Sequence, residues 1–222
     1  MPHPSELAIA LSSIQIASSN PGKIAECRLG IRLWQEQTGQ GGEWSIDLTP
    51  GFDRLPPCPE EAGSFSGNAQ QKALHYSRLV GGLVLADDSG LEVDALRGAP
   101  GVKSRRFAGP GATDADNNDK LLHLLAGVPA AKRTARFVCV LALAQAGQLL
   151  APFRGVAEGM ILDSPRGSGG FGYDPLFLDP ESRMTFAEFS PEEKLARSHR
   201  GKALRAMLAW MVTQPLSRSA SV

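Results

Sequence analysis

Apolar and polar positions alternate in several segments of the chain, whereas in other segments the apolar residues recur at helical spacing. Alternation predicts a strand at residues 13–18, and a short continuous apolar run predicts a buried strand at residues 83–86. Further strands are expected at residues 44–48, 134–145, 149–160 and 177–178. The helical spacing predicts helices that begin at Pro21, near Ser66, after Thr113, at Pro191 and after Ser198. The two longest strands are joined at Ala146 and Gly147, so we expect a hairpin that either extends the sheet or forms a second lobe.

The strand predicted at residues 83–86 ends at Asp87, Asp88, Ser89 and Gly90. Because side chains alternate along a strand, the two carboxylates are expected to point to opposite sides. Acidic residues at the carboxyl end of a buried strand lie where open α/β sheets bind their ligands. An ordinary turn is the alternative, since Asp-Ser-Gly is also common turn chemistry.

The segment 18–23 follows the first strand and begins the first helix. Ser19 or Asn20 can cap that helix, and Pro21 suits its first position because the N–H that proline lacks is not needed there. Free backbone N–H groups, the helix dipole and Lys23 together favour binding of phosphate. A plain capped helix without a ligand is the alternative interpretation.

Two later segments carry further candidate chemistry. Residues 165–174 contain four glycines with Phe171 and Tyr173, a composition that lets the backbone approach a flat ligand beside an aromatic surface. His199 and Arg200 lie at the start of the last helix, where cations oppose the helix dipole, so an anion is expected nearby.

A basic cluster at Lys103, Arg105 and Arg106 is interpreted as a solvated rim, with phosphate neighbours as the alternative. Glu60 and Glu61 precede the second predicted helix, where acids usually complement the dipole. Glu61 matters for a site only if the fold brings it close to Asp88.

Composition narrows the class of protein. The 222 residues include 42% hydrophobic and 21% charged residues, with 23 basic and 23 acidic side chains, so neither a nucleic-acid partner nor a polybasic membrane anchor is expected. The three cysteines form no metal-binding pattern and are expected to be reduced thiols in a cytoplasmic protein. Neither a signal peptide nor a membrane span is expected, and residues 1–12 and 214–222 are expected to be disordered.

Four motifs resemble those of the inosine triphosphate pyrophosphatases, which hydrolyse non-canonical purine nucleoside triphosphates. They are Ser-x-Asn-Pro-Gly-Lys at 18–23, Ala-Asp-Asp-Ser-Gly-Leu at 86–91, Gly-Gly-Phe-Gly-Tyr-Asp-Pro at 169–175, and Glu-Lys followed after four residues by His-Arg-Gly at 193–201. The resemblance extends from about Ile14 to Leu208, so residues 1–222 are expected to form a single pyrophosphatase domain.

The resemblance implies a two-lobed α/β fold with a central mixed sheet flanked by helices, an active-site cleft between the lobes, a homodimer and dependence on Mg²⁺. It implies that Asp88 is the catalytic residue and a metal ligand, with Glu61 as a second metal ligand and Glu60 as the alternative to it. The implied substrate-binding residues are Ser18, Ser19, Asn20, Pro21, Gly22, Lys23, Ser89, Phe171, Gly172, Tyr173, Asp174, Lys194, His199 and Arg200. Whether Asp87 or Asp88 activates the water is left open by the sequence, although Asp88 is favoured.

The expected reaction releases a nucleoside monophosphate and pyrophosphate from the triphosphates of inosine, deoxyinosine and xanthosine. Donors that meet the 6-oxo group would reject adenine, and cationic donors from Lys194, His199 or Arg200 would repel the 2-amino group of guanine. Two alternatives remain: a Maf-type nucleotide pyrophosphatase with another base preference, and a non-catalytic nucleotide-binding regulator.

Overall fold

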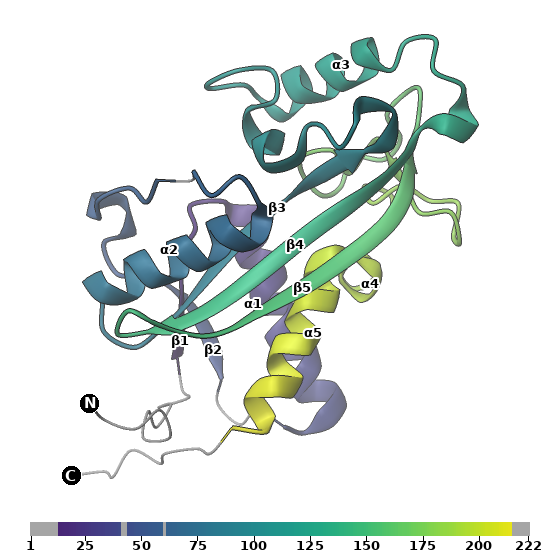
Figure 1. Cartoon of the computed structure of the whole chain (residues 1–222). Helices are drawn as coiled ribbons and strands as arrows, with labels where there is room; N and C mark the ends of the chain where they lie inside the picture. Colours follow the sequence, from purple (N-terminus) through teal and green to yellow (C-terminus); the bar gives the residue numbers. More distant parts are fainter. Residues whose placement is uncertain (1–12, 41–43, 60, 215–222) are drawn as a thin grey trace, which may run out of the picture.

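A mixed sheet of six strands forms the centre of the protein in the computed structural model, which describes residues 13–40, 44–59 and 61–214. The strands lie in the order β2-β1-β3-β4-β5-β6 (Figure 1). Strand β1 (Ser13–Ile16) pairs in parallel with β2 (Ser45–Leu48) and with β3 (Leu83–Val93). The remaining pairs are antiparallel: β3 pairs with β4 (Thr134–Gln145), β4 with β5 (Gln148–Ile161), and β5 with β6 (Phe177–Leu178). The prediction of a mixed sheet flanked by helices is confirmed.

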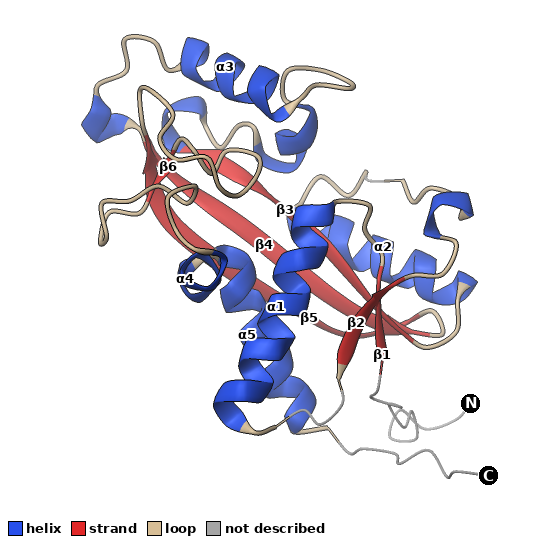
Figure 2. Cartoon of the chain, turned by 180° about the vertical axis from the view of Figure 1, so that it is seen from behind, coloured by secondary structure: helices blue, strands red, loops and turns tan. Residues whose placement is uncertain are grey.

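Helices cover both faces of this sheet. On one face, α1 (Pro21–Thr38) and α5 (His199–Val212) pack over Leu85 and Leu141 (Figure 2). On the other face, α2 (Phe65–Leu79) packs over Ala86 and Val140. Alternate residues of β3 therefore serve two different cores, as the period of two in a strand requires.

The long strands β3, β4 and β5 continue beyond α1 and α2 and build a second lobe, the upper one in Figure 1. This lobe also contains α3 (Asp114–Leu124), short 3₁₀ helices and β6. Its core includes Leu91, Val93, Leu121, Phe137 and Phe177. The predicted hairpin is confirmed, and it both extends the sheet and forms the second lobe.

Strand β3 does not end at Ala86, and the turn interpretation of the residues that follow is wrong. Asp87, Asp88, Ser89 and Gly90 continue the strand and pair in register with Leu141, Val140, Cys139 and Val138 of β4. Pairing with this long partner overrides the local turn preference of the sequence. Strand β1 ends opposite Leu85, so the two carboxylates lie just beyond the carboxyl end of a parallel strand.

Local capping follows the sequence closely. The Asn20 side chain accepts a hydrogen bond from the Lys23 backbone N–H at 3.0 Å and caps α1, while Ser198 caps α5 and Thr113 caps α3. Helix α4 (Pro191–Arg197) begins at the predicted proline. These caps satisfy donors that a helix start otherwise leaves free.

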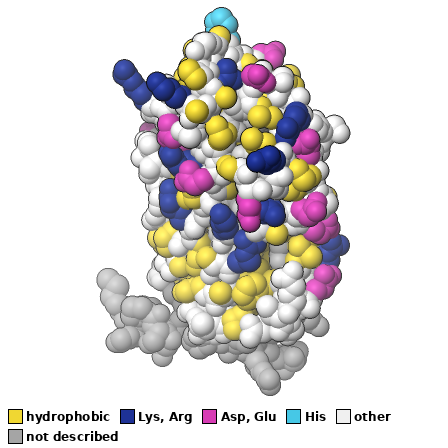
Figure 3. Space-filling model, turned by 90° about the vertical axis from the view of Figure 1, so that its right-hand side faces the viewer, with side chains coloured by type: hydrophobic (Ala, Val, Ile, Leu, Met, Phe, Trp, Pro, Cys, Tyr) yellow, Lys and Arg dark blue, Asp and Glu magenta, His cyan; other side chains and the backbone are white. Residues whose placement is uncertain are grey.

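The ends predicted to be disordered lie outside the described residues, except for Gln214, which donates a side-chain hydrogen bond to Trp210 at 3.3 Å. Among the helices that the structure describes, none combines the length and hydropathy that crossing a bilayer requires. On the face shown in Figure 3, basic and acidic side chains are interspersed with hydrophobic ones, in keeping with the balanced charge of the sequence.

Candidate active site

A cavity of about 670 Å³ lies between the two lobes. The first lobe contributes the segment after β1, the start of α1 and the middle of β3. The second lobe contributes the 3₁₀ helix η4 (Gly101–Arg106) and residues 165–174, which we call the glycine-rich loop. The predicted site residues in its wall are Ser18, Ser19, Asn20, Lys23, Asp88, Ser89, Phe171, Gly172, Tyr173, Asp174, Lys194, His199 and Arg200. Pro21, Gly22 and Glu61 do not line the cavity.

Gly22 instead allows a close approach between α1 and the glycine-rich loop. A Cβ atom at Gly22 would lie 2.5 Å from the Phe171 ring, a distance that real Cβ atoms do not reach. The same ring lies under the ammonium of Lys194, whose Nζ is 4.6 Å from the ring centroid. Phe171 is thereby held against the phosphate-binding candidate segment of the first lobe.

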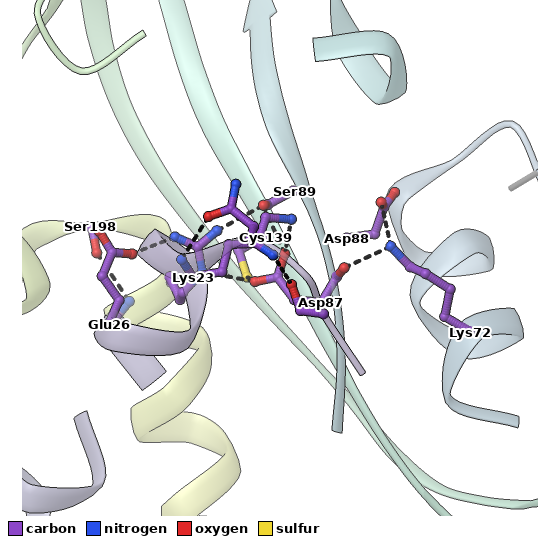
Figure 4. Close-up of polar contacts among 12 residues, drawn as sticks. Lys23, Glu26, Lys72, Asp87, Asp88, Ser89, Cys139 and Ser198 are labelled. Atoms are coloured by element: carbon purple, nitrogen blue, oxygen red, sulfur yellow. Dashed lines mark hydrogen bonds and ion pairs between the residues drawn. The ribbon is translucent and has the colours of Figure 1, made fainter. Parts of the chain in front are cut away.

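Asp87 is the buried centre of the site on the α1 and α5 side of the sheet. Its Oδ1 accepts hydrogen bonds from Lys23 Nζ at 2.5 Å and from Ser89 Oγ at 2.9 Å (Figure 4). Its Oδ2 accepts from Arg200 Nε at 2.8 Å and from Cys139 Sγ at 3.4 Å. Burial alone would favour the neutral acid, but Arg200 and Lys23 hold the pKa of Asp87 well below its usual range. Asp87 is therefore a fixed anion that orders its neighbours.

Asp88 points to the opposite face of β3, toward α2, as Figure 4 shows. Its Oδ1 accepts a hydrogen bond from Lys72 Nζ at 3.0 Å, and its Oδ2 accepts one from Asn68 at 3.2 Å. Burial raises the pKa of Asp88 above its ordinary value, with Lys72 opposing that shift. Of the two neighbouring carboxylates, Asp88 is the one whose proton affinity is raised.

Lys72 and Asn68 were not identified as site residues from the sequence. They lie four residues apart on α2 and so share one side of the helix. That side is the one predicted to be apolar from Ala69, Ala73 and Tyr76, all of which are buried. The sequence did contain a sign of them, namely an asparagine and a lysine on an otherwise apolar helix face. Such residues are seldom buried without a partner, so their position indicates a polar partner nearby.

A third missed residue, Glu26, joins the cations of the last two helices. It pairs with Lys194 Nζ at 2.6 Å and accepts a hydrogen bond from Arg200. Although burial opposes ionisation, Arg200 and Lys194 hold the pKa of Glu26 below its ordinary value. Lys194 also contacts Asp174 at 2.5 Å. The anion expected near the start of α5 is thus provided by carboxylates of the protein itself.

Tyr173 and His199 make contacts within the protein that the sequence did not indicate. The Tyr173 hydroxyl donates to the Ser104 carbonyl at 2.8 Å and fixes the glycine-rich loop to η4. The His199 ring stacks on Phe137, with centroids 4.7 Å apart. Burial and the neighbouring Arg200 guanidinium hold the pKa of His199 well below its usual range. These surroundings favour the neutral imidazole, and the role of His199 as a cationic donor stays a prediction that they oppose.

The carboxylates of the cavity fit a metal that arrives with its substrate better than a metal held by the protein alone. Within the described ranges, no group of three histidine, cysteine or acidic residues is arranged to hold an ion. Glu61 is exposed, and Glu60 lies outside the described residues. Mg²⁺ commonly uses one or two carboxylates and completes its shell with phosphates and water, and Asp88 meets that requirement.

Comparison with known proteins assigns the family. A model of the Ham1 family matches residues 14–210. The chain belongs to the Ham1 family. The dITP/XTP pyrophosphatase of Desulforamulus reducens is 48% identical over 190 residues, which cover 86% of this chain and 90% of that protein. The dITP/XTP pyrophosphatase of Thermus thermophilus is 44% identical over 209 residues, 94% of this chain and 96% of that protein.

Solved structures of Ham1 proteins share the fold. The HAM1 protein of Coxiella burnetii superposes with a TM-score of 0.77 and 39% identity, covering 90% of this chain and 98% of that chain. The Ham1 protein of Staphylococcus aureus gives a TM-score of 0.76 and 34% identity, covering 90% and 97%. The resemblance stated from the four motifs is confirmed at the level of the family and of the fold.

We expect Asp87→Asn to destabilise the protein by about 3 to 5 kcal/mol, because it removes one partner of a buried ion pair and leaves Lys23 and Arg200 less well compensated. Urea denaturation measures the change. Asp119→Asn is the matched control, since Asp119 is exposed on α3. Equal stability of the two variants would contradict the central position of Asp87.

We also expect His199 to make stability depend on pH. A neutral buried imidazole that takes up a proton only on unfolding lowers the free energy of unfolding as the pH falls below about 6.5, by up to about 1.4 kcal/mol per pH unit. His199→Gln should therefore lose less stability than the wild type between about pH 7 and pH 5. His123→Gln, at an exposed position on α3, should keep the wild-type slope. A wild-type slope in His199→Gln would show that folding does not lower the pKa of this imidazole.

Proposed function

We propose that the chain hydrolyses non-canonical purine nucleoside triphosphates, those of inosine, deoxyinosine and xanthosine, to the monophosphate and pyrophosphate. The observation that carries this proposal is the position of Asp88, a buried carboxylate of raised pKa in a cavity that also contains the start of α1. The relatives named dITP/XTP pyrophosphatases, which are 44 to 48% identical to this chain, support the same activity.

The chemistry requires a water molecule to attack phosphorus while the bond to the departing pyrophosphate breaks. Asp88 orients that water and accepts its proton, a role that its position in the cavity wall allows. Lys72 Nζ lies 3.0 Å from Asp88 and 2.8 Å from the Asp87 carbonyl oxygen, so it fixes the carboxylate in position. Asp87 positions its neighbours rather than accepting the proton, because its ion pairs with Lys23 and Arg200 keep its carboxylate ionised.

Phosphates are received at the segment that follows β1. Asn20 caps α1 while Ser18 and Ser19 line the same cavity, so backbone N–H groups and hydroxyls are available to phosphate oxygens. Lys23 donates to Asp87 and keeps further ammonium protons for a ligand. These groups are in place before the substrate binds, so little reorganisation accompanies the reaction.

Mg²⁺ is the proposed cofactor, and Asp88 is the residue that would hold it. Bound there with the substrate phosphates, the ion would neutralise charge on the transferred and departing oxygens. Glu61 is proposed as a second metal ligand, although it is exposed and does not line the cavity of the structure.

The base is proposed to lie between the glycine-rich loop and the start of α5. Phe171 offers an aromatic face beside Lys194 and Arg200, which supply cationic donors. The neutral His199 carries a buried Nδ1 for which the described residues supply no hydrogen-bond partner. A polar atom left unsatisfied in the wall of a cavity is suited to a ligand that supplies the missing partner.

The two alternatives receive no support of their own. Membership of the Ham1 family argues against a Maf-type enzyme. The position of Asp88 in the cavity wall, with burial raising its pKa, favours a catalytic role over nucleotide binding alone. A homodimeric assembly and a cytoplasmic location belong to the proposal as predictions.

Asp88→Asn should lower kcat by at least about a hundredfold in a protein that still folds, because an amide cannot accept the proton of the attacking water. The thermal unfolding temperature should fall below that of the wild type, because the buried pair with Lys72 is lost. Hydrolysis of inosine triphosphate and a thermal melt measure the two quantities. Asp119→Asn should match the wild type in both. A kcat within about tenfold of wild type would remove Asp88 from the mechanism.

A panel of nucleoside triphosphates with Mg²⁺ tests the activity directly. We expect kcat/KM to be about a hundredfold higher or more for inosine, deoxyinosine and xanthosine triphosphates than for adenosine and guanosine triphosphates, because the wrong base leaves buried polar groups unpaired. Orthophosphate should appear only after a pyrophosphatase is added. Direct release of orthophosphate, or equal use of adenosine triphosphate, is incompatible with the proposed function.

A further inference from the structure

The cations that the sequence assigns to the triphosphate are already neutralised within the protein. Lys23 pairs with Asp87 at 2.5 Å, and Arg200 pairs with Asp87 and with Glu26. Lys194 pairs with Glu26 and with Asp174. These pairs are buried or nearly so, and their charges are therefore matched in place.

The cation on the other face of β3 is also neutralised within the protein. Lys72, the additional cation of the site, pairs with Asp88 at 3.0 Å. Four cations are thus balanced by four carboxylates: Lys23, Lys72, Lys194 and Arg200 by Glu26, Asp87, Asp88 and Asp174. This balanced group provides directed hydrogen bonds but no excess positive charge for a highly charged anion.

Excess positive charge is available on the wall that faces this group. Among the described residues that line the cavity, the other cations are Arg105 and Arg106 of η4. Arg105 is exposed, and in the part of the chain that the structure describes its side chain forms no hydrogen bond or ion pair. The neighbouring Lys103 is also exposed but does not line the cavity. The structure therefore separates three residues that the sequence treated as one solvated rim.

Helix η4 lies over the same face of β3 as Asp88. Asp88 and Gly90 are two residues apart in the strand and so share a face. A Cβ atom at Gly90 would lie 2.3 Å from Ser104 Oγ and 2.7 Å from the Gly101 carbonyl oxygen, so only glycine admits η4 here. Arg105 follows Ser104 directly and is thereby placed on the side of the proposed reacting phosphate.

The backbone that carries Arg105 is firmly held. The Arg105 carbonyl accepts a hydrogen bond from Asn117 at 3.1 Å, and the Ser104 carbonyl accepts one from the Tyr173 hydroxyl at 2.8 Å. Ser104 Oγ in turn accepts from the Leu91 backbone N–H at 2.9 Å. A flexible charged side chain on a fixed backbone can reach a ligand without a rearrangement of the lobe.

We propose that Arg105 binds the terminal phosphates of the substrate, and the pyrophosphate that leaves, as an uncompensated cation supplied by the second lobe. This inference rests on the proposed function, and it assigns to Arg105 the recognition of the departing pyrophosphate. The planar guanidinium suits this task because it can donate two parallel hydrogen bonds to a phosphate.

Arg105→Gln tests this assignment, with Lys103→Gln on the same 3₁₀ helix as the matched control. We expect Arg105→Gln to raise KM for inosine triphosphate, and the inhibition constant of inorganic pyrophosphate with Mg²⁺, by about tenfold to a hundredfold, the range for a hydrogen bond to a charged group. Inhibition by inosine monophosphate should stay within about twofold, because the monophosphate lacks the terminal phosphates. Lys103→Gln should leave all three constants near wild type.

Arg105→Lys separates charge from geometry: recovery of part of the pyrophosphate affinity supports the proposal, since a lysine keeps the charge without the fork. Equal constants for Arg105→Gln and Lys103→Gln would overturn it, as would an equal loss of affinity for monophosphate and pyrophosphate. Failure of the proposed function is distinguishable, because the wild type itself would then release orthophosphate directly or use adenosine triphosphate as well as inosine triphosphate.

Discussion

The ion pairs of Asp87 hold the site together. This carboxylate lies in the middle of β3 and contacts Lys23 of α1, Cys139 of β4 and Arg200 of α5. A buried charge without partners is very costly, so the three elements that supply the donors are required to pack around it. The position of α1 determines where the candidate phosphate-binding segment begins, and the position of α5 determines where the candidate base pocket lies.

The geometry of β3 places two neighbouring aspartates, Asp87 and Asp88, in environments that shift their pKa values in opposite directions. Asp87 faces two cations and has a lowered pKa, whereas Asp88 faces one lysine and an amide and has a raised pKa. The period of two in β3 is sufficient to separate them, since each side chain enters a different environment. One carboxylate therefore serves as a fixed anion while its neighbour can exchange a proton.

Local signals in the sequence were enough for part of this arrangement. The cap at Asn20, the start of α5 at Ser198 and the opposite orientations of Asp87 and Asp88 depend on neighbouring residues and were predicted. The continuation of β3 depends on pairing with β4, about 50 residues away, and local turn chemistry indicated the wrong answer. The contact of Glu26 with Arg200 joins residues 174 positions apart, so spacing within either helix contained no sign of it.

In the proposed site, the balanced group of ion pairs and the cationic wall of η4 opposite it have different functions in binding a nucleotide. Directed donors on the first lobe orient phosphates without a net attraction that would also retain the products. Arg200 illustrates this, because three of its five N–H donors are committed to Asp87, Glu26 and Ser89. Net attraction must then come from a cation that no carboxylate neutralises, and Arg105 of the second lobe has that property among the described residues. In the proposed site, binding of a triphosphate would depend on both lobes at once, which gives a physical reason for a cavity that lies between them.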